Sequence, residues 1–261
     1  MTDERFKRLL AVLIALATLA ATVITFLQSD AGARDDRANR DARRYTFEAF
    51  GQRVSGDARV NFDYNRAYQA WYELNLLADS AEAREDPAAA ERYRAVRDEL
   101  TRLSPLLAAP YFDAAAGEPN VAQYESDTYV VAITTLTEKY LAAAVVKDAW
   151  DAKANAYVFH ITLLAVALFL FGLAATLSQP ATRWIFTGVG LLIAVVAVGQ
   201  AAWTFFQPVT DRREQAGAID AYARGVGLAY QGRPEEALAA FDQAVAASPD
   251  YANAFVARAG A

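Results

Sequence analysis

The sequence predicts an all-α membrane protein with three transmembrane helices. Hydrophobic residues make up 55% of the 261 residues, above the roughly 45–50% of soluble domains. The excess is concentrated in three uncharged blocks, 9–27, 157–177 and 184–206. A helix rises about 1.5 Å per residue, so about 20 residues cross a hydrocarbon core of roughly 30 Å. The remaining sequence shows helical spacing and few strand signals.

Residues 1–8 form a basic tail ahead of the first span, 9–27, with Arg5, Lys7 and Arg8. A cleaved signal peptide is the alternative interpretation, because Ala31-Gly32-Ala33 resembles a cleavage site. The apolar run is longer than the apolar core of a usual signal peptide, which has about 7–15 residues. We therefore expect the segment to stay as a transmembrane helix.

The first span carries small residues at alternating steps of four and three, which places them on one helical face. Small residues let helix backbones approach closely in lipid. The pattern predicts a helix–helix seam, within the chain or between copies of a homo-oligomer; chance in an Ala- and Thr-rich segment is the other interpretation. The seam consists of Ala11, Ala15, Thr18, Thr22 and Thr25.

Residues 28–156 read as a soluble helical domain. Asp86-Pro87 is typical of a helix start, and Ser55-Gly56-Asp57 predicts a break between helices. A last helix begins near Asn120 and meets no breaker until Gly172. These signals predict a four-helix-bundle-like domain between the first two spans. In architecture alone it resembles the ligand-binding domains of bacterial chemoreceptors and sensor kinases.

Two features of this domain are candidates for function. The apolar loop 103–112 is a candidate lid, partner surface or membrane-touching tip, or a loop packed on the helix ends. An aromatic cluster is a candidate ligand pocket or ordinary core. The cluster consists of Phe62, Tyr64, Tyr68, Trp71 and Tyr72.

Composition argues against an enzyme. The chain has no cysteine, one histidine and a net charge of −6, so we expect no thiolate or zinc site, no cofactor and no nucleic-acid partner. Glu125 and Asp127 stand two apart and do not share a helical face, which disfavours a catalytic pair. His160, at the edge of the second span, is interpreted as interfacial rather than proton-sensing.

Residues 178–183 are too few for anything but a tight hairpin, so the second and third spans are expected to pack antiparallel. A linker, 207–217, follows the third span.

Residues 218–261 resemble a tetratricopeptide repeat followed by the start of a second. Small residues at fixed positions, a glycine turn and a proline after the second helix carry the resemblance, whereas Ala221 and Leu228 depart from it. The resemblance implies a helical hairpin that binds a protein or peptide. One repeat cannot bury its apolar face alone, so we expect either further repeats or packing on a neighbour, and favour the former. The matching residues are Gly225, Gly232, Ala237, Phe241, Ala244 and Pro249.

Three spans place the bundle and the hairpin on one side of the membrane. The basic tail and Arg183 favour a cytoplasmic N-terminus and an extracytoplasmic bundle and hairpin; the basic residues that follow the first and third spans oppose this. Arginine outnumbers lysine 21 to 4, which suits a bacterial inner-membrane protein. We expect a membrane-anchored scaffold or adaptor; a small-ligand sensor is the alternative, and an enzyme or transporter ranks below both. The opposing residues are Arg34, Arg37, Arg40, Arg43, Arg44, Arg212 and Arg213.

Overall fold

The computed structural model describes residues 3–209 and 215–260. The chain forms two compact units, Met1–Ala42 with Ala142–Arg212, and Arg43–Leu141 with Arg213–Ala261. Helices α1 (Asp3–Phe62) and α5 (Val131–Thr176) contribute residues to both units. Three helices are long and apolar enough to cross a membrane, which confirms the predicted helical class and the three candidate spans.

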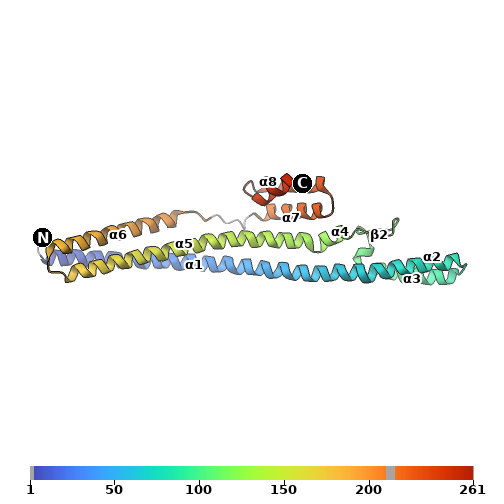
Figure 1. Cartoon of the computed structure of the whole chain (residues 1–261), viewed down its shortest axis with the longest axis horizontal. Helices are drawn as coiled ribbons and strands as arrows, with labels where there is room; N and C mark the ends of the chain where they lie inside the picture. Colours follow the sequence, from blue (N-terminus) through green and yellow to red (C-terminus); the bar gives the residue numbers. More distant parts are fainter. Residues whose placement is uncertain (1–2, 210–214, 261) are drawn as a thin grey trace. The chain divides into compact units, whose positions relative to one another are not determined.

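The first unit contains the start of α1, the end of α5 and α6 (Pro180–Phe206), which lie side by side (Figure 1). At one end Arg183 contacts Asp3, with Nη1 and Oδ1 2.7 Å apart. At the other end the Lys153 ammonium donates to the carbonyl of Gln207 at 2.7 Å. Helices α1 and α6 therefore run in one direction and α5 in the other. The predicted antiparallel hairpin forms, although α6 already begins at Pro180.

The predicted seam lies on the exposed side of α1, away from α5 and α6. The buried face of α1 instead carries Phe6, Leu10, Ala17 and Ile24, which pack in apolar clusters with α5 residues. The hydroxyls of the three seam threonines each donate to the carbonyl four residues earlier, at 2.8–2.9 Å. In the described part of the chain, the seam therefore does not pack against α5 or α6. A contact of the seam between copies of the chain stays a prediction.

The predicted break at Ser55-Gly56-Asp57 is wrong, because α1 runs without interruption from Asp3 to Phe62. Gly56 faces Tyr129, and a Cβ on this glycine would lie 2.5 Å from the Cβ of the tyrosine. Real Cβ atoms do not approach that closely. The glycine therefore permits a close helix–helix approach, and glycine inside a helix costs only about 1 kcal/mol.

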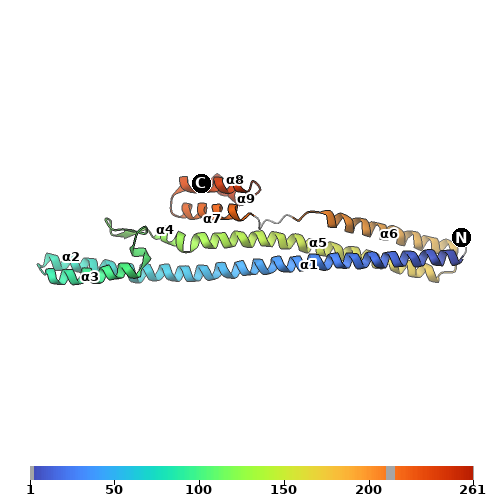
Figure 2. The same cartoon turned by 180° about the vertical axis from the view of Figure 1, so that it is seen from behind.

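After α1, a π-helical turn η1 (Asp63–Tyr68) leads into α2 (Gln69–Ala83), and α3 (Pro87–Leu103) folds back on it. Asp86 caps α3 as predicted, accepting the backbone N–H of Ala89 at 3.0 Å. Helices α2 and α3 lie side by side in both views (Figures 1 and 2), with small buried residues between them. This pair is what the structure describes; a bundle of four helices stays a prediction. The buried small residues are Ala78, Ala81 and Ala90.

The segment after α3 contains a 3-10 turn η2 (Pro105–Leu107) and a short antiparallel pair, β1 (Phe112–Asp113) with β2 (Glu118–Pro119). Asn120 then caps α4 (Val121–Glu125) by accepting the backbone N–H of Gln123 at 3.0 Å. A second π-helical turn, η3 (Ser126–Val130), joins α4 to α5. The predicted helix start near Asn120 is confirmed.

The C-terminal segment forms α7 (Ala216–Tyr230), α8 (Pro234–Ala247) and α9 (Ala252–Gly260). Gly232 turns the chain between α7 and α8 with φ +72°, a conformation that favours glycine. Helices α7 and α8 lie side by side (Figure 2). We call α7 and α8 the C-terminal hairpin. Arg212 and Arg213 fall outside the described residues.

Candidate functional site

Four of the five residues of the predicted aromatic cluster, Tyr64, Tyr68, Trp71 and Tyr72, pack together around the ring of Tyr68. Tyr68 is stacked with Trp71, with ring centroids 6.4 Å apart, and Phe112 from β1 packs edge-on against Trp71 at 4.8 Å. Phe62 is 63% exposed. Trp71 thus packs against the β1–β2 segment, and a ligand pocket at the cluster stays a prediction.

The apolar loop 103–112 folds inward rather than forming an open lid. Leu106 is fully buried and Leu107 is 2% exposed. Leu106 packs with Val60 and Tyr124, which tie α1 to α4. Leu103 is 73% exposed, and Pro105, Ala109 and Pro110 are exposed as well. The loop thus packs over the contact between α1 and α4.

A buried carboxylate that the sequence did not single out lies under this loop. Asp63, at the first position of η1, accepts a hydrogen bond of 2.9 Å from the hydroxyl of Ser104. It also accepts from the hydroxyl of Tyr124, and Arg59 approaches at 3.9 Å. Burial and then the bond to Asp63 raise the pKa of Tyr124 to about 12. These hydrogen bonds join η1, the residue that follows α3, and α4. Asp63 is only 4% exposed, so its carboxylate is not accessible to a substrate.

The strongest candidate functional site is the contact between the C-terminal segment and α5. Glu138, only 7% exposed, accepts a hydrogen bond of 2.7 Å from the hydroxyl of Tyr251. The side-chain amide of Asn253 donates to both oxygens of the same carboxylate, at 2.9 and 3.1 Å. Burial and the bond to Glu138 raise the pKa of Tyr251. Tyr251 and Asn253 together donate three hydrogen bonds to one carboxylate.

A second part of this contact lies at η3. The hydroxyl of Ser126, which is fully buried, donates to the carbonyl of Gly227 at 3.0 Å and accepts from the side-chain amide of Gln231 at 2.9 Å. A Cβ on Gly227 would lie 2.5 Å from Cγ2 of Val131 and 2.7 Å from the Ser126 hydroxyl. The absence of a side chain at position 227 therefore lets α7 approach η3.

The two carboxylates considered as a catalytic pair have separate partners. Asp127 accepts from the hydroxyl of Tyr111 at 3.1 Å, while Glu125 accepts from the hydroxyl of Tyr230 in α7. Glu125 of α4 is therefore a third point of contact with the C-terminal segment, and we call the contacts at Glu125, Ser126 and Glu138 the docking contact. His160 is 5% exposed, and its Nε2 lies 3.3 Å from the Thr204 hydroxyl of α6.

Four of the six residues that carry the repeat resemblance are buried in the hairpin, whereas Gly232 and Pro249 are exposed. Ala237 and Ala244 are fully buried and Phe241 is 3% exposed. A side chain on Gly225 would overlap the ring of Phe241. Pro249 follows the end of α8. The four buried residues lie in the contact between α7 and α8, whereas Glu138 of α5 and its partners Tyr251 and Asn253 carried no signal in the sequence.

Comparison of the chain with protein-family models, with curated proteins and with solved structures finds no match. Within residues 3–209 and 215–260, no group of three or more His, Asp or Glu side chains is placed to hold a metal ion.

Proposed function

We propose that this chain is an integral membrane protein of a bacterial inner membrane that binds other proteins through its tetratricopeptide-like C-terminal segment. The observation that carries the proposal is the burial of Glu138 between Tyr251 and Asn253. Here the C-terminal segment binds α5 of the same chain through hydrogen bonds to one carboxylate. A surface that recognises a helix in this way suits a helical partner of the same chemistry.

The partner inferred from this geometry is a helical segment that presents one carboxylate and, about three turns earlier, a small hydroxyl residue. In α5 and η3 these roles belong to Glu138 and Ser126, twelve positions apart. Both groups are desolvated, and a buried donor that loses its acceptor costs about 1–3 kcal/mol. The pair therefore supplies specificity for a carboxylate-bearing helix.

The remaining surface of the C-terminal segment suits a second contact. Phe255 is 42% exposed and Val256 is 74% exposed on α9. Exposed apolar side chains of this kind favour a further helix packed on α9. This agrees with an adaptor that engages more than one element.

The test uses the full chain and a synthetic peptide of residues 120–141 as the probe. In the receptor, Ser126→Arg with Glu138→Ala blocks docking of its own helix and leaves the C-terminal segment unaltered. We expect the labelled peptide to bind this variant and not the wild type, whose site is occupied at the high effective concentration of an intramolecular contact.

The peptide with Glu138→Gln is the matched control and should bind at least tenfold more weakly. Anisotropy of the labelled peptide measures all three cases. If the variant keeps its helix content and binds neither peptide, the segment is not a helix-binding module and the proposal fails.

A further inference from the structure

The helix that the C-terminal segment contacts contains one residue more than a regular α-helix would need. In η3 the backbone N–H of Val131 donates to the carbonyl of Ser126, five residues earlier. In an α-helix the same donor would bond to the carbonyl four residues earlier. Helical turns of the wider kind are rare and often lie at functional sites. Because the hydroxyl of Ser126 also donates to Gly227 of α7, the extra residue lies inside the docking contact.

The extra residue changes which side chains share a face of the helix. Each residue turns an α-helix by about 100°, so Ser126 and Val131 would lie about 140° apart around a regular helix. With one residue taken up by the π-helical turn, the angle falls to about 40°. Gly227 lies against both side chains, since an added Cβ would be 2.7 Å from the Ser126 hydroxyl and 2.5 Å from Cγ2 of Val131. The π-helical turn thus lets both residues face one point of α7.

The same turn aligns Ser126 with Glu138. These residues are twelve positions apart, which corresponds to about 120° on a regular α-helix. With the extra residue of η3 the angle is about 20°. Ser126 is fully buried, Glu138 is 7% exposed, and both bond to the C-terminal segment. A regular helix with this sequence would present only one of the two groups to that segment.

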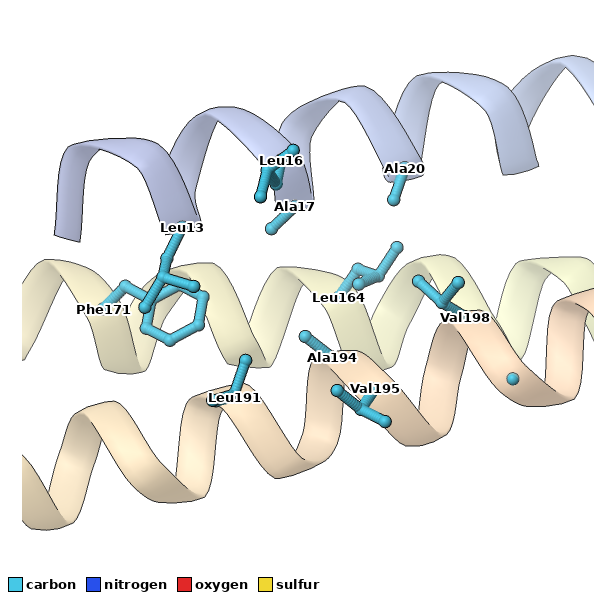
Figure 3. A pocket seen from close by; sticks show the side chains of 11 residues that line it. Leu13, Leu16, Ala17, Ala20, Leu164, Phe171, Leu191, Ala194, Val195 and Val198 are labelled. Carbon is cyan, nitrogen blue, oxygen red and sulfur yellow. The ribbon is translucent and has the colours of Figure 1, made fainter. Parts of the chain in front are cut away.

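The regular part of α5 shows what an offset of about 20° allows. Leu164 and Phe171 are seven residues apart, which is also about 20° on an α-helix. In Figure 3 both side chains point into one space, where they line a groove of about 420 Å³. Neither is more than 1% exposed. Two side chains with this offset therefore meet one surface, whereas an offset of about 120° places them on different faces.

We propose that the C-terminal segment recognises a hydroxyl and a carboxylate aligned on one helical face, and that on an uninterrupted α-helix of another protein it prefers them eleven residues apart. Eleven residues make three turns and differ from perfect alignment by about 20°. The segment accepts the spacing of twelve in its own chain because η3 takes up the extra residue. Where it concerns other proteins, this inference rests on the proposed function. A partner with a spacing of eleven needs no π-helical turn, which favours it over α5 in competition for the segment.

Three labelled peptides test the spacing against the full chain with Ser126→Arg and Glu138→Ala, in which docking of its own helix is blocked. The first peptide is residues 120–141, and the second is the same peptide without Thr128, which has the spacing of eleven. The third, residues 120–140, has the length of the second and keeps the spacing of twelve. We expect the second to bind about tenfold more tightly than the others, because an isolated helix forms an α turn more readily than a π-helical turn.

Fluorescence anisotropy of the peptides separates the possible results. Glu138→Gln in the second peptide should remove its advantage, because the carboxylate is then absent. If residues 120–141 bind and the second peptide binds no more tightly, the preferred spacing is wrong while the proposed function stands. If none of the peptides binds, the proposed function fails, and the alignment is decided within the chain.

Two variants of the full chain make that decision. Deletion of Thr128 should preserve docking, because a regular helix then aligns Ser126 with Glu138. Insertion of one alanine after Thr134 should abolish docking, because the two residues then lie about 120° apart even with the π-helical turn.

Hydrogen exchange of the α7 and α9 backbone amides measures docking in both variants. Exchange should stay within about threefold of the wild type after the deletion and become at least about tenfold faster after the insertion. Circular dichroism checks that both variants keep their helix content. Equally accelerated exchange in two folded variants would overturn the proposal, and if the deletion variant does not fold, the peptide comparison decides.

Discussion

The carboxylate of Glu138 in α5 and the hydroxyl of Tyr251 before α9 form a buried hydrogen bond of 2.7 Å between residues 113 positions apart in the chain. Asn253 completes the binding of that carboxylate. The contact joins the C-terminal segment to the helix that continues as the second candidate span. Loss of this hydrogen bond therefore removes a contact of α5, a helix that contributes residues to both units.

Removing the carboxylate should loosen the C-terminal segment without unfolding it. In Glu138→Ala, Tyr251 and Asn253 lose their acceptor, which costs about 1–3 kcal/mol. We expect hydrogen exchange of α7 and α9 backbone amides to speed up roughly tenfold to a hundredfold in the full chain, since 1.4 kcal/mol corresponds to tenfold. Glu235→Ala, at an exposed position in α8, is the control. Equal exchange in both variants would count against the contact.

The close approach at Gly56 makes a second prediction. Gly56→Ala should destabilise the contact between α1 and η3 by about 1–3 kcal/mol, since the added methyl overlaps Tyr129 at atoms that cannot move aside. Gly51→Ala, on the same helix with no atom within 4 Å of the added Cβ, should be neutral or stabilising by up to about 1 kcal/mol. Thermal unfolding followed by circular dichroism measures both. A destabilised Gly51→Ala with an unaffected Gly56→Ala would contradict the packing described.

The buried hydroxyl of Tyr124 predicts a loss of stability in alkali. Its pKa rises from 10.0 to about 12 in the folded chain, so the folded state retains a proton that the unfolded chain has released. The stabilisation is complete below pH 10 and is lost as pH rises from about 10 to about 12, with a slope of about 1.4 kcal/mol per pH unit from this residue. Tyr124→Phe should lack this slope.

Urea unfolding at pH 9, 10 and 11 measures the difference between the wild type and Tyr124→Phe. The other tyrosines are present in both chains, so their titration cancels in the comparison. Parallel curves for the two chains would show that Tyr124 does not hold its proton in the folded state.

Sidedness can be measured because the chain has no cysteine. Single cysteines at Ala88 in α3 and Ala239 in α8, both exposed, are treated with a membrane-impermeant maleimide before and after lysis. We expect both sites to react in intact cells, which would place α3 and the hairpin outside the cytoplasm. Reaction of both only after lysis would reverse the orientation; reaction of one would contradict three membrane crossings.

The three candidate spans, the helix starts at Asp86 and Asn120 and the turn at Gly232 could be predicted from the sequence, because they depend on neighbouring residues. An uncharged apolar run has a length and a transfer free energy of its own. Asp86 and Asn120 cap helices through N–H groups three residues ahead. The turn at Gly232 likewise depends on one residue's own φ.

Contacts between distant segments required the tertiary structure. Gly56 reads as a helix break until Tyr129 is placed beside it, and the seam of the first span reads as a packing face until the opposite side of α1 is seen against α5. Arg183 and Asp3, or Glu138 and Tyr251, carry no mutual signal in the sequence. A helix offers several small or apolar faces of similar intrinsic stability, and only complementary side chains from remote segments determine which face is buried.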